Sequence, residues 1–356
     1  MDKTQSHISR GTGAMPLPKR IWMLWFQGAE EMPWLVRRCY ESWIECNPSW
    51  EIMLLSEANL NQYVDLDYSN LSYLGKAALA DLIRLELLAK YGGVWVDATC
   101  LCMRPLENWL PGYFQSGFFA FDRPGRDRPL ASWFIAASPR NPLVVNWFSE
   151  LRTYLASVKF RNREHPLAWA ALHIILGRYE RTALLWFSRF VHRGIKIYPY
   201  FSLHYKFLEI LKRDADCSAI WAATPRLSAG LADFGLRRIA PLRPISDQII
   251  REINQECAPM YKLTWKGVPD HIPVNSLLGY LLDTSQTVRS CSPVTTRQDA
   301  IVKPRLSSHA ASAESPRNRR GASRVKGVPS ERFRHRIDHL IRIQQRLHAL
   351  RKARNE

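Results

Sequence analysis

The chain has 356 residues, of which 46% are hydrophobic and 23% charged, a composition typical of a soluble globular protein with one large or two modest domains. The richest apolar run, residues 167–177, is too short for a membrane-spanning helix and contains His173. Length and composition therefore exclude a protein built on spanning helices. The net charge of +18 is concentrated near the C-terminus, because residues 286–356 hold 17 of the 50 Lys and Arg but only 5 of the 32 Asp and Glu.

The N-terminal sequence and the cysteine content indicate in which cellular compartment the protein is expected. Residues 1–15 mix charged side chains with Gly and Ser and lack the hydrophobic segment of a secretory signal. The seven Cys are odd in number and include no pair at CxxC spacing, so we expect reduced thiols rather than disulfides or a zinc site. Both observations predict a cytoplasmic protein.

Composition divides the chain into four stretches. Residues 1–17 are polar, and we expect them to be disordered, whereas residues 18–283 contain all 13 Trp and must hold the core. Residues 284–329 are rich in Ser, Thr, Arg and Pro, which predicts a disordered linker. Residues 330–356 regain helical periodicity with many basic side chains. The sequence thus predicts one folded domain, a linker and a basic amphipathic helix.

Strands and helices alternate within residues 18–283. Short apolar runs predict strands, and apolar residues at near-helical spacing predict helices. In chain order we expect a strand over 19–26, a helix over 33–46, a strand over 50–55, a helix over 74–91, a strand over 94–102, another strand over 132–137 and a helix from 142 onward. This order predicts an α/β fold whose sheet has parallel neighbours.

One helix and the strand that follows it carry the chemistry. Asp81 and Arg84 are three residues apart and share a face of the predicted helix 74–91. Gly92 and Gly93 end that helix in a sharp turn, and Asp97 interrupts the apolar strand behind it. Because a carboxylate in a buried strand needs compensating groups, we expect the three charged side chains to converge on one cleft.

This pattern has two interpretations, a structural one and a functional one. An Asp/Arg pair at this spacing is usually a surface ion pair, and an Asp after a strand is often a turn residue. Two carboxylates and a guanidinium also suit a metal-bound diphosphate, since oxygen ligands hold a hard cation and Arg offers paired donors to phosphate or sugar oxygens. The fixed spacing of helix, double glycine, strand and Asp favours the second reading.

The segment ALADLIRLELLAKYGGVWVDAT, residues 78–99, resembles the signature of the capsular polysaccharide synthesis family. That family is related to yeast initiation-type mannosyltransferases and to the glucosyltransferase domains of large clostridial toxins. The shared pattern is Asp, two residues, Arg, then YGG, a short strand and an Asp-x-Asp motif. PLPKRIWMLWFQG at 16–28 resembles the opening strand of the family, and YKLTWK at 261–266 and NSLLGYLL at 275–282 again look like family features.

The resemblance implies a GT-A type, Rossmann-like nucleotide-diphospho-sugar transferase that moves a sugar from a nucleotide sugar, with a UDP-sugar favoured, to a polysaccharide or lipid-linked acceptor. Trp25 would stack on the nucleotide base. Asp81 would accept hydrogen bonds from ribose or sugar hydroxyls, and Arg84 would contact the sugar or diphosphate. Trp95 would line the nucleotide pocket, and Asp97 would bind a divalent cation or the sugar. The toxin relatives retain anomeric configuration, which favours retention here.

The sequence departs from the family pattern at the third residue of Asp-x-Asp, which is Thr99. The resemblance assigns a Mn²⁺ or Mg²⁺ ion to Asp97 and Thr99, but a hydroxyl is a weaker ligand than a carboxylate. Metal dependence therefore stays open. So does the acceptor base, for which Asp122, Asp233, Asp247 and Asp270 are all candidates.

Several residues outside the signature have two interpretations each. Trp133 lines an acceptor pocket or packs in the core, and we expect His204 to pack in the core. Lys262, next to Tyr261, is a candidate for binding the phosphates as a point charge. Residues 167–190 combine aromatic side chains with three Arg, which suits a membrane surface or lipid-linked acceptor as well as a buried helix pair.

The basic helix 330–356 also has competing interpretations. Apolar residues such as Phe333 and Leu340 fall on one side, and arginines cover the others. An anionic membrane surface is favoured, ahead of a partner helix and of nucleic acid. For the whole chain, the alternatives to a transferase are a basic nucleic-acid-binding protein and a catalytically inactive scaffold that binds sugar nucleotides.

Overall fold

The computed structural model describes residues 16–65, 67, 71, 73–158, 166–233 and 242–287. The N-terminal part alternates strand and helix as predicted. Its elements are β1 (Arg20–Leu24), α1 (Trp34–Cys46), β2 (Glu51–Leu55), the short 3-10 turn η1 (Leu60–Gln62), α2 (Lys76–Tyr91) and β3 (Gly93–Val96). β1 pairs in parallel with both β2 and β3. The mixed α/β class with parallel central strands is therefore confirmed.

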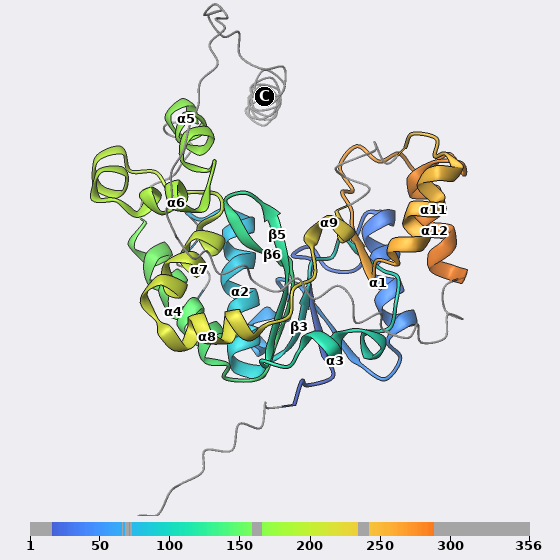
Figure 1. Cartoon of the computed structure of the whole chain (residues 1–356), viewed down its shortest axis with the longest axis horizontal. Coiled ribbons are helices and arrows are strands. Elements are labelled where there is room, and N and C mark those ends of the chain that lie inside the picture. Colours follow the sequence, from blue (N-terminus) through green and yellow to red (C-terminus); the bar gives the residue numbers. More distant parts are fainter. Residues whose placement is uncertain are drawn as a thin grey trace, which may run out of the picture. The chain divides into compact units, whose positions relative to one another are not determined.

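The main sheet has five strands in the order β2-β1-β3-β6-β5 (Figure 1). β5 (Phe118–Gly125) and β6 (Arg128–Ala137) form an antiparallel pair, and β6 also runs antiparallel to β3. Because β1 and β3 are parallel neighbours, their carboxyl ends meet at one edge of the sheet. In open α/β sheets ligands bind at this edge, and Trp25 and Asp97 follow the two strands there.

Hydrophobic side chains cover both faces of the sheet. Alternate residues of β3 point to opposite faces, so Trp95 packs in one cluster, and Val94 and Val96 pack in the other. In Figure 1, α2, α4 (Pro142–Ser157), α7 (Ser202–Arg213) and α8 (Ala215–Ala223) lie on one side, and α1 lies on the other with α3 (Leu110–Tyr113). Leu106 of η3 (Leu106–Asn108) packs in the same cluster as α1. The catalytic candidates of α2 therefore belong to the Trp95 face.

The predicted strand 94–102 is wrong in one respect, because it is two strands in two sheets. β3 ends at Val96, and β4 (Cys100–Cys102) pairs antiparallel with β7 (Met260–Lys262) in a separate two-stranded sheet. The backbone N–H of Cys100 donates to the carbonyl of Asp97 at 2.9 Å, which closes a turn over Asp97–Thr99. Both strands are apolar, so the sequence pattern gave no sign of the change of sheet.

Gly92 and Gly93 make the return from α2 to β3. Their φ angles are +66° and +94°, a region that other residues rarely adopt. A Cβ on Gly92 would lie 2.6 Å from the backbone N of Pro139, and one on Gly93 would lie 2.6 Å from the carbonyl oxygen of Arg20. The double glycine therefore packs the end of the helix directly against the sheet.

The remaining elements surround this core. They are α5 (Pro166–Leu176), α6 (Glu180–Ala183), the 3-10 turn η4 (Leu184–Phe187), the π-helical turn η5 (Phe190–Ile195), α9 (Ala229–Ala232), α11 (Asp247–Glu256) and α12 (Leu277–Thr287). α12 continues past the predicted domain end at 283. Residues 1–15 of the predicted tail 1–17, almost all of the predicted linker 284–329 and the predicted basic helix 330–356 lie outside the described residues, whereas Leu17 packs against the core. In the part of the chain described, no helix is both long and apolar enough to span a membrane.

Candidate active site

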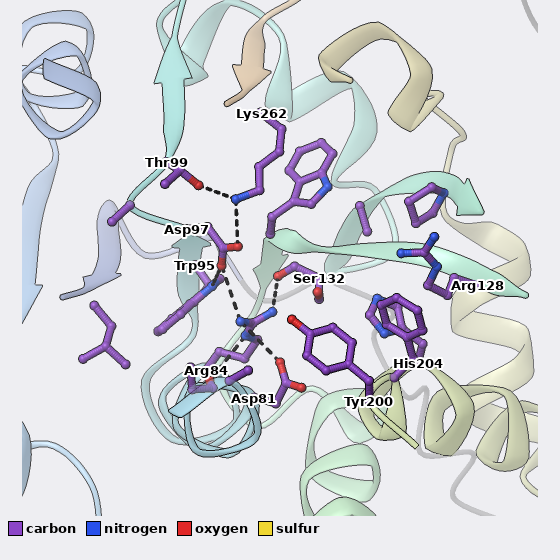
Figure 2. A pocket seen from close by; sticks show the side chains of 18 of the residues that line it. Asp81, Arg84, Trp95, Asp97, Thr99, Arg128, Ser132, Tyr200, His204 and Lys262 are labelled. Atoms are coloured by element: carbon purple, nitrogen blue, oxygen red, sulfur yellow. Dashed lines mark hydrogen bonds and ion pairs between the residues drawn. The ribbon is translucent and has the colours of Figure 1, made fainter. Parts of the chain in front are cut away.

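A cavity of about 480 Å³ opens at the carboxyl edge of β1 and β3. Residues from β1, α2, the β3–β4 turn, β6, the start of α7 and β7 line it (Figure 2). All seven site residues expected from the sequence lie on its wall, namely Trp25, Asp81, Arg84, Trp95, Asp97, Thr99 and Lys262. The structure thus brings them together as predicted, and their chemical roles stay predictions.

Arg84 lies at the centre of the charged cluster. Its Nη2 is 3.3 Å from Oδ1 of Asp81 and 3.4 Å from Oδ1 of Asp97. Its Nη1 donates to the backbone carbonyl of Ser132 at 2.7 Å, and the guanidinium lies over the Trp95 ring, 5.0 Å from its centroid. The side chain is only 6% exposed. Arg84 is therefore a buried cation, unlike the surface ion pair that its spacing alone suggests.

Asp97 is held by a donor on each carboxylate oxygen. Oδ1 accepts from the indole N–H of Trp95 at 3.0 Å and lies beside Arg84, while Oδ2 accepts from Nζ of Lys262 at 3.2 Å. Burial alone would raise the pKa of Asp97, but the charges of Lys262 and Arg84 outweigh it and lower the pKa. Asp97 is therefore ionised at neutral pH.

Asp81 has the opposite electrostatic character. Burial raises its pKa to about 6, with Arg84 opposing the rise and Asp97 adding to it. Arg84 is shared between the two carboxylates, and its attraction does not offset the burial of Asp81. Asp81 therefore changes its charge close to neutral pH, which suits a group that exchanges hydrogen bonds with ligand hydroxyls.

Lys262 comes from β7, 165 residues after Asp97. The strand register pairs it with Cys100, and the N–H of Leu263 donates to the carbonyl of Thr99 at 2.9 Å. This pairing brings the ammonium against the turn, where it donates to both Asp97 and the hydroxyl of Thr99. The negative charge of Asp97 overcomes the cost of burial and raises the pKa of Lys262. The lysine is therefore charged.

The predicted metal pair does not fit a divalent cation. Oδ2 of Asp97 and the hydroxyl of Thr99 both accept hydrogen bonds from Lys262, so an ammonium lies where the ion would bind. Asp81 is engaged by Arg84. Within the described residues no three His, Cys, Asp or Glu side chains gather into a metal-binding group. A dication here would meet two fixed positive charges and a single carboxylate with a neutral hydroxyl, which is a poor ligand set.

The two tryptophans differ in exposure and contacts. Trp25 follows β1, is partly exposed on the cavity wall, and packs edge-to-face with Trp265 at a centroid distance of 5.9 Å. It presents the kind of aromatic surface on which a base stacks. Trp95 is 2% exposed and donates to Asp97 beneath the Arg84 guanidinium. Its main contacts position the charged side chains, so little of its ring remains for a nucleotide.

A second wall of the cavity carries residues that the sequence did not assign to a site. Tyr200, just before α7, points its hydroxyl toward the charged cluster, and His204 of α7 lies beside Arg128 of β6 (Figure 2). His204 is buried as predicted, but it lines the cavity, which the core assignment missed. Its Nδ1 has no hydrogen-bond partner among the described residues. Burial, with the nearby charges of Arg128 and Arg84, lowers the pKa of His204 well below its usual value.

Two earlier candidates also lie on the cavity wall. Trp133 of β6 lines it and packs against Phe121 at a centroid distance of 4.9 Å, so it is both a wall residue and a core residue. Asp233, directly after α9, lines it as well and is the one acceptor-base candidate among the four that does so in the described structure. The aromatic stretch around His204 was the available signal for this wall, but its periodicity does not separate cavity from core.

The chain is similar in sequence to a known protein family and to several glycosyltransferases. Residues 3–165 match the family described as capsular polysaccharide synthesis protein. The chain is 32% identical over 151 residues to the O-glycosyltransferase braB of Annulohypoxylon truncatum, a match that covers 36% of each protein. It is 22% identical over 162 residues to the initiation-specific alpha-1,6-mannosyltransferase of Candida albicans, covering 43% of this chain and 40% of that enzyme. The chain thus spans about two fifths of the length of these relatives.

Among solved structures, the chain is similar to the PaToxG glycosyltransferase, with a TM-score of 0.30 and 13% identity over 68% of this chain and 86% of that one. The family match extends from the N-terminal residues through α4, so it includes β1, α2 and the β3–β4 turn. The resemblance expected from the YGG motif is therefore confirmed: residues 3–165 of this chain carry the sequence signature of the capsular polysaccharide synthesis proteins.

Proposed function

We propose that this protein is a glycosyltransferase with a GT-A type fold that takes a sugar from a nucleotide-diphospho-sugar, with a UDP-sugar favoured. The observation that carries the proposal is the position of two cations, Arg84 and Lys262, on either side of Asp97 at the carboxyl edge of parallel strands. Such an edge is the usual ligand site of α/β sheets, and paired cations match a diphosphate. The names of the relatives support the same activity.

The cavity offers a group for each part of the donor. Trp25 provides an aromatic surface for the base, and Asp81 accepts hydrogen bonds from ribose or sugar hydroxyls. Arg84 and Lys262 attract the diphosphate, and Asp97 keeps both cations in place. Fixed charges stabilise the negative charge that develops on a leaving phosphate, because they need no rearrangement during the reaction.

The opposite wall suits the acceptor. Trp133, Tyr200 and His204 combine aromatic surface with hydroxyl and imidazole groups, the combination that binds sugar rings and their hydroxyls. Because the pKa of His204 is low, its imidazole is neutral and can accept as well as donate a hydrogen bond. We propose that the acceptor is a polysaccharide or lipid-linked glycan of the cell surface, in line with the family description.

A lipid-linked acceptor requires a position close to the membrane. The segment from α5 to η5 exposes Ile175, Tyr179, Leu185 and Phe190, of which Phe190 is 73% exposed. Arg178, Arg181 and Arg189 lie in the same segment. Exposed apolar and basic side chains together favour an anionic bilayer. We therefore propose a cytoplasmic protein that binds the inner face of the membrane, with the basic segment 330–356, which the sequence predicts to be helical, as a second contact.

The first test is isothermal titration of the full chain with UDP, GDP, CDP, ADP and dTDP, beside the Asp97→Asn variant. A transferase binds at least one of them, loses that binding in the variant, and hydrolyses or transfers the matching nucleotide sugar. An inactive scaffold binds without turnover. A nucleic-acid-binding protein binds no nucleoside diphosphate and loses its function when residues from 284 onward are removed. Failure of all five titrations contradicts the proposed function.

A further inference from the structure

We propose that the ammonium group of Lys262 takes the place of a divalent cation at the Asp97–Thr99 turn and binds the donor diphosphate directly, so that sugar transfer needs no metal ion. This inference rests on the glycosyltransferase function proposed above. It concerns the pair of residues to which the family resemblance assigns the ion.

The position of the ammonium is set by the fold. β7 pairs with β4 in a register that puts Lys262 opposite Cys100, directly after the turn. The residue after the lysine, Leu263, donates a backbone hydrogen bond to the carbonyl of Thr99, which fixes the chain on the C-terminal side of Lys262. The side chain of Lys262 is 20% exposed and that of Asp97 is 27% exposed, so both reach the cavity while remaining mostly shielded. The fold therefore fixes the ammonium group of Lys262 at the Asp97–Thr99 turn.

The charges of the site balance without an ion. In an Asp-x-Asp site two carboxylates offset a dication. Here Thr99 removes one of those carboxylates, and Lys262 adds one positive charge beside the remaining Asp97. Asp81 and Arg84 form a second balanced pair. An ion placed between Asp97 and Thr99 would have to displace the lysine and would be repelled by Arg84.

The lysine has hydrogen-bonding capacity left for a ligand. An ammonium has three donor hydrogens, and Asp97 and Thr99 accept two of them. The third is available to a phosphate oxygen in the cavity, which Lys262 lines. Lysine binds phosphate as a compact point charge, in the manner of a bound ion. Arg84 adds a second positive charge close to Lys262, because both side chains pair with Asp97.

This arrangement serves the group-transfer step. The bond between the anomeric carbon and the β-phosphate oxygen breaks, and its electron pair remains on the phosphate oxygen. The acceptor hydroxyl oxygen forms the new bond to the anomeric carbon and releases its proton to the departing phosphate or to water. Lys262 stabilises the charge that gathers on the phosphate, which is the contribution that a metal ion makes in other sites.

The experiment titrates the full-length protein with the same five nucleoside diphosphates, once in EDTA and once in Mn²⁺. We expect the same dissociation constant in both buffers. Lys262→Met weakens binding about 10-fold to 100-fold, because a hydrogen bond to a charged group is lost. Lys262→Arg retains part of the affinity. Lys266→Met, which changes an exposed lysine outside the cavity, is the matched control and binds like the wild type.

A second measurement follows Mn²⁺ alone, without nucleotide, by calorimetry or by the loss of its free paramagnetic resonance signal. The wild type is expected to show no saturable binding. The double variant Lys262→Ala with Thr99→Asp restores a two-carboxylate turn and removes the ammonium, so we expect it to bind Mn²⁺ and to bind nucleotide only when Mn²⁺ is present. This gain of metal binding does not depend on enzymatic turnover.

The outcomes separate the two proposals. Nucleotide binding that EDTA abolishes and Mn²⁺ restores in the wild type overturns the role of Lys262 but leaves the glycosyltransferase standing. Saturable Mn²⁺ binding by the wild type that Asp97→Asn removes also overturns the role of Lys262. Absence of nucleotide binding in every buffer overturns the proposed function, and the diphosphate contact of Lys262 with it.

Discussion

Replacing Arg84 by methionine tests whether the charged cluster is a buried, interdependent unit. Arg84 is 6% exposed and pairs with Asp81 at 3.3 Å and Asp97 at 3.4 Å. It also donates to the carbonyl of Ser132. Methionine has a similar length and keeps contact with the Trp95 ring, but leaves two carboxylates without this cation. Removing one partner of a buried ion pair costs about 3–5 kcal/mol.

Chemical and thermal unfolding provide the assay. At about 2 °C per kcal/mol for a domain of this size, the melting temperature should fall by roughly 6–10 °C. The urea midpoint should fall with an unchanged m value, since the exposed surface of the unfolded chain stays the same. Arg84→Lys should lose less than methionine, because it keeps the charge but lacks the fork that reaches both carboxylates.

The matched control is Arg152→Met, which changes an exposed arginine of α4 that lies over the ring of Phe148. Its effect should stay within about 0.5 kcal/mol. A loss below about 1 kcal/mol for Arg84→Met would refute the reasoning, since that value is typical of solvated surface pairs. It would mean that water reaches Asp81 and Asp97 as soon as the arginine is gone.

Four further predictions concern Asp81, Gly93 and Phe190. Asp81 is ionised above a pKa of about 6, so nucleotide binding should weaken as the pH falls through 6, and Asp81→Asn should remove that dependence. Because this pKa is raised from 3.8, ionisation of Asp81 lowers stability as the pH rises from about 4 to 6, and Asp81→Asn should flatten the unfolding free energy over that window. Gly93→Ala should reduce the soluble yield or the melting temperature, because its Cβ would meet the Arg20 carbonyl at 2.6 Å. Phe190→Glu should reduce sedimentation with anionic liposomes and leave the melting temperature unchanged, since the ring is exposed.

Each of these predictions has a control or a contradicting result. Asp122→Asn, at a carboxyl outside the cavity wall, serves as the comparison for the pH profile at Asp81. A pH-independent wild type would contradict the pKa argument. Gly28→Ala changes another glycine of positive φ that has no atom within 4 Å of the added Cβ, so it isolates conformational strain from collision at Gly93. Equal sedimentation of Phe190→Glu and wild type would remove that residue from the membrane contact.

The part of the site that could be predicted is local in the sequence. Only the rest of α2, Gly92 and the four-residue strand that begins at Gly93 separate Arg84 from Asp97, so secondary structure alone brings Asp81, Arg84 and Asp97 close. Trp25 was assigned from the family resemblance alone, and the parallel pairing of β1 with β3 explains why it lies at the same sheet edge as Asp97. Helical and strand periodicity were sufficient only for the cluster of Asp81, Arg84 and Asp97.

The remainder depends on long-range pairing that no local pattern encodes. The division of residues 94–102 between two sheets results from β7, which offers a partner to β4. Lys262 reaches Asp97 through that pairing, and its sequence context indicated only a possible phosphate contact. His204 lies among aromatic residues that pack in the core, and the path of α7 beside β6 turns it toward the cavity.

The pairing of β4 with β7 has a consequence for how the protein is assembled. A fragment cut to the family match at 165 would leave the backbone edge of Cys100–Cys102 open and the Asp97 carboxylate without its lysine. During synthesis the nascent chain therefore cannot complete the candidate site until residue 262 has left the ribosome. Affinity for nucleotide should then emerge late, as a sign that β7 has been added.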